Sequence, residues 1–169
     1  MWWPKPLLAA LALLALGLAG CGLQPLYGST ASGSRLAAVM SSVEVAPVPG
    51  RVGPRVRNEL IFENTGGGGA APQTNYKLDI IIKENLTNEL VKISGDAKSQ
   101  VYELDATFKL ISKDGKVVLE GKATSRAAYE RYETIFSNVR ARQDAENRAA
   151  RTVAESIKVR IAAYLSQAA

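Results

Sequence analysis

Three segments in which apolar and polar residues alternate constrain the fold of this chain more than any other feature. They run from about residue 76 to 90, from 102 to 110 and from 117 to 127, and each gathers its apolar residues on one face. Such alternation is typical of strands in a sheet that is covered on one side only. Asp114-Gly115 favours a tight turn between the second and third segments, and Ser94-Gly95-Asp96 marks the other hairpin tip. We therefore expect an antiparallel meander.

The residues on either side of the meander predict one more strand and two helices. Val43 and Val45 alternate before Pro47 and form a short strand, and Gly53-Pro54 begins a helix that ends in a glycine run from residue 66. From about Asn138 an apolar stripe of helical spacing follows, made of Ala149, Ala150, Val153, Ala154, Ile157, Ile161, Tyr164 and Leu165. The chain is expected to be α+β, with a mainly antiparallel four-stranded sheet, two helices packed on its apolar face, and the order β-α-β-β-β-α.

The N-terminus has the three parts of a secretory signal peptide. Lys5 precedes an apolar run over 7–18, and small residues lead into Cys21. The apolar run is too short to cross a hydrocarbon core of about 30 Å. Leu18-Ala19-Gly20-Cys21 resembles the lipobox of bacterial lipoproteins, in which the cysteine sulfur carries a diacylglycerol and its amine is acylated. We expect a signal peptide over 1–20, a lipid-anchored tether over 21–42 and one domain over 43–169; an ordinary secretory signal is the alternative.

Composition limits the chemistry that the chain can perform. The sequence contains one cysteine and no histidine, which excludes a Cys/His zinc site and the commonest general base. Without the signal, 20 basic and 16 acidic residues leave a net charge of +4, which suits an anionic partner. A hydrolase with a Ser–Lys pair is an alternative, but no Gly-x-Ser-x-Gly elbow or phosphate-binding loop supports it. We expect no enzymatic activity, no cofactor, no metal and no nucleic-acid partner.

The residues that follow Cys21 resemble the opening of a known family. Gly22-Leu23-Gln24-Pro25-Leu26-Tyr27-Gly28 is similar to the Cys-Gly-Phe-x-Pro-Leu-Tyr opening of LPS-assembly lipoproteins of the LptE family, in its alphaproteobacterial form, with Leu23 in place of Phe. The element order and the Asp-Ala and Arg-Ala steps between Asp144 and Ala149 also fit. The resemblance implies an outer-membrane lipoprotein that binds and plugs the LptD β-barrel, assists its assembly and binds lipopolysaccharide. Gly22, where an aspartate would retain a lipoprotein at the inner membrane, agrees with an outer-membrane location.

Basic residues are the candidates for contact with lipopolysaccharide. Arg140 and Arg142 have no acid four residues before them and lie where a helix N-terminus favours anions. The resemblance assigns ligand contact to a basic residue in this region, and Arg142 is the nearest match. It also implies a basic residue at the hairpin tip, which is Lys92 or Lys98. Lysines at a turn can equally serve only to keep a strand edge soluble.

Other charged and aromatic residues have more ordinary interpretations. Spacings of three or four residues predict ion pairs of Asp144 with Arg148 and of Glu155 with Arg151 and Lys158 along the last helix. An aromatic cluster is expected to pack across the start of that helix, with a barrel contact as the alternative: Tyr129, Tyr132, Ile135 and Phe136.

The charged sheet face can meet either water or the polar lumen of a barrel. We expect it to contain Lys77, Asp79, Lys83, Glu103, Lys109, Glu120, Lys122 and Arg126. The family resemblance, rather than the alternation, favours the lumen. A different envelope interaction lipoprotein, such as an auxiliary subunit of a lipid transporter, would share the anchor and the amphipathic sheet and remains the alternative function.

Overall fold

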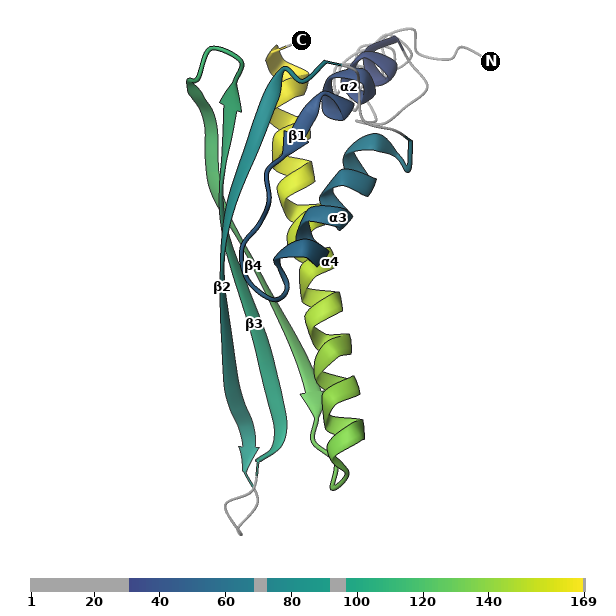
Figure 1. Ribbon diagram of the computed structural model, residues 1–169, viewed down its shortest axis with the longest axis vertical. Coiled ribbons are helices and arrows are strands. Elements are labelled where there is room, and N and C mark those ends of the chain that lie inside the picture. The colour runs from purple at the N-terminus through teal and green to yellow at the C-terminus, as the bar shows by residue number, and fades with distance from the viewer. Residues whose placement is uncertain (1–30, 69–72, 92–96, 169) are drawn as a thin grey trace, which may run out of the picture.

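The computed structural model describes residues 31–68, 73–91 and 97–168. In these residues the chain forms three helices and one four-stranded sheet (Figure 1). The elements are α2 (Ala31–Ser41), β1 (Val43–Val45), α3 (Gly53–Thr65), β2 (Tyr76–Val91), β3 (Ala97–Ser112), β4 (Val117–Glu130) and α4 (Ile135–Ala168). The predicted α+β fold is confirmed, with one additional helix at its beginning.

The sheet has the order β1-β2-β3-β4 and is antiparallel except for its first pair. β2 to β4 form the meander that the alternation predicts, with Leu78 opposite Leu110 in the pairing of β2 with β3. The Asp114-Gly115 turn between β3 and β4 is confirmed, and Gly115 has the positive φ of 77° that glycine adopts at low cost. β1 pairs in parallel with β2, Val43 opposite Tyr76, so the short strand joins the β2 edge.

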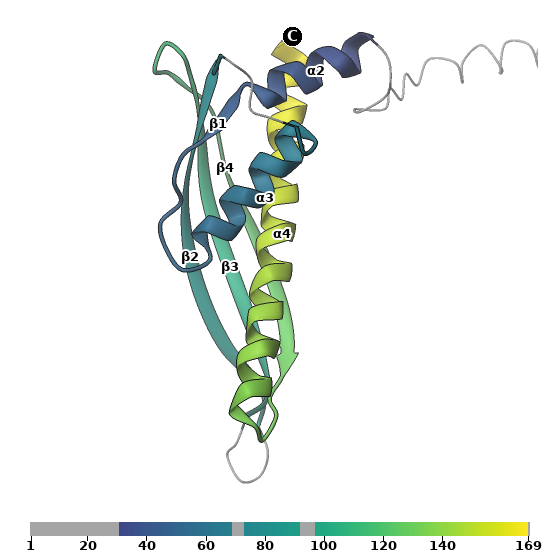
Figure 2. The same ribbon diagram turned by 45° about the vertical axis from the view of Figure 1, so that its right-hand side comes forward.

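The helices cover the apolar face of the sheet in two tiers. α4 lies on β3 and β4, and α3 packs against α4 and β1 (Figures 1 and 2). The apolar stripe of α4 is buried as predicted, apart from Tyr164, which is half-buried. Tyr102 and Phe108 of β3 belong to the same core and are its largest fully buried side chains. Val56 and Leu60 of α3 are also fully buried. Long-range apolar burial therefore holds the helices to the sheet.

Helix α2 corrects the prediction of a tether that extends to residue 42. Leu36, Val39 and Met40 have the i, i+3, i+4 spacing of one helix face, and Leu36 and Met40 are 4% and 2% exposed. The small and polar residues around them concealed this short stripe. The part of the predicted tether that lies before residue 31 is outside the described residues.

Charged side chains on α4 attach this helix to both neighbouring layers. Asp144 and Arg148 form the predicted ion pair at 2.8 Å, whereas Arg151 binds Glu59 of α3 at 3.3 Å. Lys158 binds Glu63 of α3 at 2.5 Å. The prediction of Glu155 as the partner of Arg151 is therefore wrong, because α3 brings its own carboxylate closer.

The edge strand β4 also receives polar contacts from α4. The Arg148 guanidinium donates to the Ala128 carbonyl at 2.9 Å, and Arg160 donates to the Lys122 carbonyl at 2.5 Å. These bonds give the backbone of an edge strand partners that would otherwise be water or another strand. Among the helices that the structure describes, none combines the length and the apolar character needed to span a bilayer.

Candidate functional site

The candidate ligand residues lie toward one end of the elongated domain. β2 ends at Val91, β3 begins at Ala97, β4 ends at Glu130 and α4 begins at Ile135 at this end, which we call the distal end (Figure 1). Helix α2 lies at the opposite end, beside the C-terminal part of α4 (Figures 1 and 2). The 34 residues of α4 separate the two ends by about 50 Å at 1.5 Å per residue.

The structure places the four basic candidates unequally. Arg140 and Arg142 lie in the first turns of α4, close to the distal end. Lys98 is the second residue of β3, and its side chain is outside what the structure describes. Lys92 lies outside the described residues altogether. The assignment of ligand contacts to these four residues stays a prediction.

Arg142 has an acidic partner that follows it in the sequence, whereas the prediction considered only acids that precede it. Its Nε donates to Oε1 of Glu146 at 2.8 Å, one helical turn further along α4. The Glu146 side chain is 5% exposed, so Arg142 helps to neutralise a buried carboxylate. Arg142 is therefore partly committed to the fold. Arg140, in contrast, makes no ion pair within the described part of the chain.

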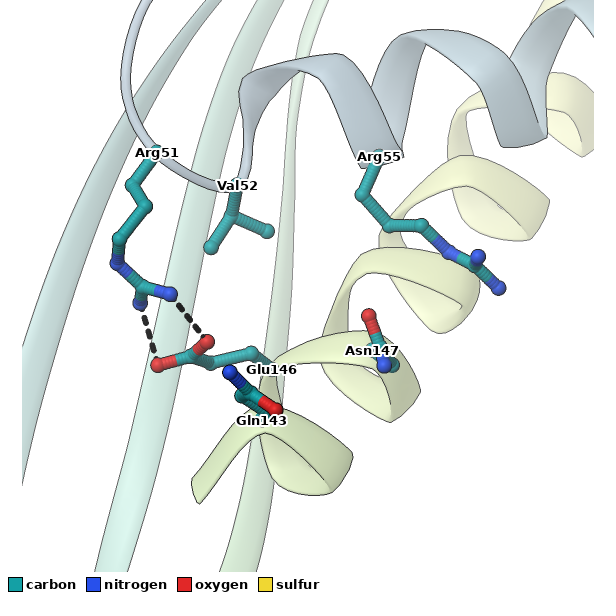
Figure 3. A pocket seen from close by; sticks show the side chains of 6 residues that line it. All are labelled: Arg51, Val52, Arg55, Gln143, Glu146 and Asn147. Atoms are coloured by element: carbon teal, nitrogen blue, oxygen red, sulfur yellow. Dashed lines mark hydrogen bonds and ion pairs between the residues drawn. The ribbon is translucent and has the colours of Figure 1, made fainter. Parts of the chain in front are cut away.

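Glu146 is the centre of an ion network that joins three elements. The guanidinium of Arg51, in the loop before α3, makes two hydrogen bonds to the two carboxylate oxygens of Glu146 (Figure 3). The same guanidinium lies 3.3 Å from Oε2 of Glu84 on β2. The hydrogen bond to Glu146 raises the pKa of Arg51, so its charge is permanent. Arg51 thus links the loop, α4 and the sheet.

Tyr102 extends this network into the core. Its hydroxyl donates to Oε2 of Glu84 at 2.9 Å while its ring is fully buried. Burial raises the pKa of Tyr102 above its ordinary value, and the hydrogen bond to Glu84 adds to the shift. The neutral phenol is therefore the form that the fold requires.

A polar cleft of about 250 Å³ opens beside the network, between the beginning of α3 and α4 (Figure 3). It is lined by Arg51, Val52, Arg55, Gln143, Glu146 and Asn147. Its acid is already bound by arginine, which is the arrangement of a structural clamp. Nor do the described residues contain any cluster of three or more acidic, His or Cys side chains that could hold a metal ion.

Sequence analysis missed Arg51, Glu84 and Glu146, although two of them left a signal. Glu84 lies in phase with Ile82 and Leu86 on the apolar face of β2, and Glu146 follows the buried Ala145 on α4. An acid in phase with a buried face requires a cationic or hydrogen-bonding partner. Arg51 itself could not be identified in this way, because it lies in a loop 95 residues before Glu146.

The aromatic cluster before α4 is not packed as predicted. Tyr129 is buried, and its hydroxyl donates to Gln100 at 2.6 Å. The other three are exposed instead, Tyr132 to 54%, Ile135 to 82% and Phe136 to 73%. The nearby Val139 is about half exposed. α4 begins three residues earlier than expected, so Ile135 and Phe136 belong to its first turn, where they remain exposed.

The outer face of the sheet is exposed, and some of its charged side chains form pairs. Lys77 lies 3.3 Å from Asp79, Arg126 lies 3.5 Å from Glu103, and Thr124 donates to a neighbouring aspartate. Such exposed pairs contribute little to stability. The face is therefore a polar, mixed-charge surface that can contact water or another polar surface.

Comparisons with known proteins identify the fold. No family model matches the chain, and no curated protein matches it. A crystal structure described as that of a lipoprotein from Caulobacter crescentus CB15 has a TM-score of 0.64 at 22% identity, covering 80% of this chain and 98% of its own. The minor lipoprotein of Acinetobacter baumannii gives 0.52 at 14% identity, with 72% and 91% covered. An NMR structure of the uncharacterized lipoprotein B of Nitrosomonas europaea gives 0.55 at 11% identity, with 73% and 83% covered.

At these identities the similarity concerns the fold. The three proteins that share the arrangement over most of their length all have "lipoprotein" in their names. The chain therefore has the α+β fold of this group, and its alternating meander and long final helix are the shared framework.

Proposed function

We propose that this chain is an outer-membrane lipoprotein of the LptE type, anchored through Cys21 on the periplasmic face. It binds and plugs an LptD-like β-barrel, assists the assembly of that barrel, and contributes to the insertion of lipopolysaccharide into the outer leaflet. The observation that carries the proposal is the combination of the lipobox and the Cys-Gly-x-x-Pro-Leu-Tyr opening with this domain. Three solved lipoproteins with the same fold support it.

The exposed face of the sheet supports the role of a plug. The lumen of an outer-membrane barrel is polar, so a protein inside it needs a polar surface with charges of both signs. The outer faces of β2, β3 and β4 offer such a surface, because charged side chains of both signs predominate there; Ile81 of β2, which is 71% exposed, is an apolar exception. α4 and the apolar core support the other face of the sheet.

The role is one of contact rather than turnover. The side chains that are brought together most closely, Arg51, Glu84, Glu146 and Tyr102, form hydrogen bonds and ion pairs to one another. A general base would instead need a free acceptor near its substrate. Function is therefore expected to lie in the surfaces of the domain.

Co-purification tests the proposed partner. The full chain with a C-terminal tag is purified from detergent-solubilised outer membranes, and bound proteins are identified by mass spectrometry. We expect a large β-barrel in stoichiometric amount. A stable complex with an inner-membrane ATPase would instead support an auxiliary subunit of a lipid transporter, and the absence of any barrel would overturn the proposal.

Charge reversal tests the lipopolysaccharide contacts. Lys92→Glu, Lys98→Glu and Arg140→Glu together should weaken lipopolysaccharide binding while circular dichroism shows an intact fold. Arg142 is left unchanged in this variant, because its substitution would also release the buried Glu146. Unchanged affinity in the folded triple variant would exclude these residues as the ligand contacts.

A further inference from the structure

The long strand β2 has an unpaired edge over most of its length. β1 pairs with it only from Tyr76 to Leu78, and one more backbone bond joins the Ala46 N–H to the Leu78 carbonyl. Pro47 follows, and it has no N–H with which to continue the pairing. Figure 1 shows β1 beside the upper part of β2 only. Beyond Leu78, no backbone group of the described residues pairs with this edge, so a further strand can add to it.

The direction of the backbone bonds identifies the groups that point out of this edge. The Leu78 carbonyl points toward β1. Because the N–H and C=O groups of successive residues point to alternate edges of a strand, those of Glu84, Leu86 and Asn88 point to the same side as those of Leu78. The side chains of residues 85–89 are exposed beside them, and Leu86 is 40% exposed. We call the segment from Glu84 to Asn88 the open edge.

The other edge of the sheet is blocked by side chains. The Arg148 guanidinium donates to the Ala128 carbonyl of β4 at 2.9 Å, and Arg160 donates to the Lys122 carbonyl. These two carbonyls are acceptors that an added strand would need. Within the described part of the chain, growth of the sheet is therefore hindered at β4 and possible at β2.

The open edge is complementary to a second copy of itself. When two β2 strands run antiparallel with Leu86 opposite Leu86, Glu84 lies opposite Asn88, and Lys83 lies opposite Glu89 at both ends of the segment. The outward N–H and C=O groups of Leu86 then form the two bonds of a hydrogen-bonded pair. A register centred on Glu84 would instead bring two carboxylates together. The pattern of charges therefore selects one antiparallel register.

We propose that two copies of this chain associate through their open edges, which pair antiparallel around Leu86 and join the two four-stranded sheets into one. The two β4 strands become the outer edges of the joined sheet, and Arg148 and Arg160 block both, so the assembly stops at two copies. The register shift between Asn88 and Leu90 marks a β-bulge, which ends the regular pairing. The interface is therefore short, and the dimer dissociates readily.

This inference is independent of the proposed function. It depends on the edge of β2, whereas the proposed plug depends on the outer face of the sheet. The failure of either one therefore leaves the other untouched.

Disulfide cross-linking tests the register. The chain 21–169 with Cys21→Ser contains no cysteine and no lipid anchor, so an introduced thiol reports on one position. In the proposed dimer the two Leu86 Cα atoms lie about 5.5 Å apart, within the range that a disulfide spans. We expect Leu86→Cys to form a linked dimer on mild oxidation. Asn85→Cys is the matched control, because Asn85 lies opposite Thr87, and it should link at least about tenfold more slowly.

Charge reversal tests the ends of the interface, with sedimentation velocity as the measurement of dimer affinity. Lys83→Glu places two carboxylates opposite each other at both ends, so it should raise the Kd of the dimer by about tenfold or more, and Glu89→Lys should do the same. The double variant should return the Kd to within about threefold of the original value. Lys109→Glu, on the exposed outer face of β3, is the control that should leave it unchanged. Circular dichroism verifies the fold of each variant.

Four results would overturn the inference. The first is a chain that stays monomeric at every concentration while Leu86→Cys remains unlinked. The second is equal linking of Leu86→Cys and Asn85→Cys. The third is a dimer whose Kd ignores Lys83→Glu, or a double variant that does not regain affinity. The fourth is a dimer that Phe136→Ser abolishes and Lys83→Glu does not, which would place the interface at the exposed beginning of α4.

Discussion

Replacement of Glu146 by glutamine removes the charge at the centre of the Arg51–Glu146 network and keeps the size of the side chain. Glu146 accepts two hydrogen bonds from Arg51 and one from Arg142, and only 5% of its side chain is exposed. The amide can accept at one atom but presents an N–H group to the other donors. Glu146→Gln therefore leaves at least one guanidinium N–H of Arg51 or Arg142 without its acceptor.

The cost can be worked out from the exposure of the partners. A hydrogen bond to a charged group contributes about 1.5–3 kcal/mol to stability when its partners are buried. Arg51 and Arg142 are 53% and 44% exposed, so water compensates for part of the loss. We therefore expect Glu146→Gln to lower the free energy of unfolding by about 2 kcal/mol, which corresponds to a fall in Tm of about 5 °C for a chain of this length.

Urea unfolding followed by circular dichroism measures the effect, and Asp144→Asn is the matched control on the same helix. Asp144 also pairs with an arginine at 2.8 Å, but its side chain is 68% exposed. Its loss should cost less than about 0.5 kcal/mol. Equal effects of the two substitutions would refute the reasoning that burial, rather than pairing, determines the contribution of these carboxylates.

Three further substitutions have defined outcomes. Leu36→Ala should lower the free energy of unfolding in urea by about 2–3 kcal/mol, whereas a tether residue would show no change. Gly53→Ala should lower the free energy of unfolding by about 3 kcal/mol or more, because the added Cβ would lie 2.2 Å from the Val48 carbonyl oxygen; a fall in Tm measures this loss. Because its pKa is raised in the folded state, Tyr102 makes its full contribution to the free energy of unfolding below a pH of about 10, and that contribution falls as the pH rises further. In urea unfolding at successive pH values, Tyr102→Phe should therefore lose less stability above this pH than wild type does, and parallel curves for the two proteins would contradict the reasoning.

The sheet was predictable because its signal is local. Alternation along β2, β3 and β4 requires only a covered face and an exposed one, and Asp114-Gly115 fixes one of the turns. Helix α2 was missed because its apolar face consists of Leu36, Val39 and Met40 among small residues that also suit a linker. Its stability comes from packing against the core, which no local pattern expresses.

The candidate site shows the same limit more strongly. The absence of an acid at helical spacing before Arg142 favours it as a ligand contact, whereas its partner Glu146 follows it. The second partner of Glu146, Arg51, lies 95 residues away in sequence. The exposure of Phe136 depends on where α4 begins relative to the end of β4, and helix ends are poorly determined by sequence pattern. Tertiary contacts therefore decide which basic residues remain able to bind a ligand.

Site-specific photo-cross-linking from the outer face of the sheet tests the proposed plug most directly. A photoreactive amino acid replaces Thr107 or Lys122, which are both exposed on that face, in the lipid-anchored chain in cells. Irradiation should link both positions to one large outer-membrane β-barrel. Absence of any link to a barrel from either position, with a link to a different protein from exposed Phe62 of α3, would contradict the proposal.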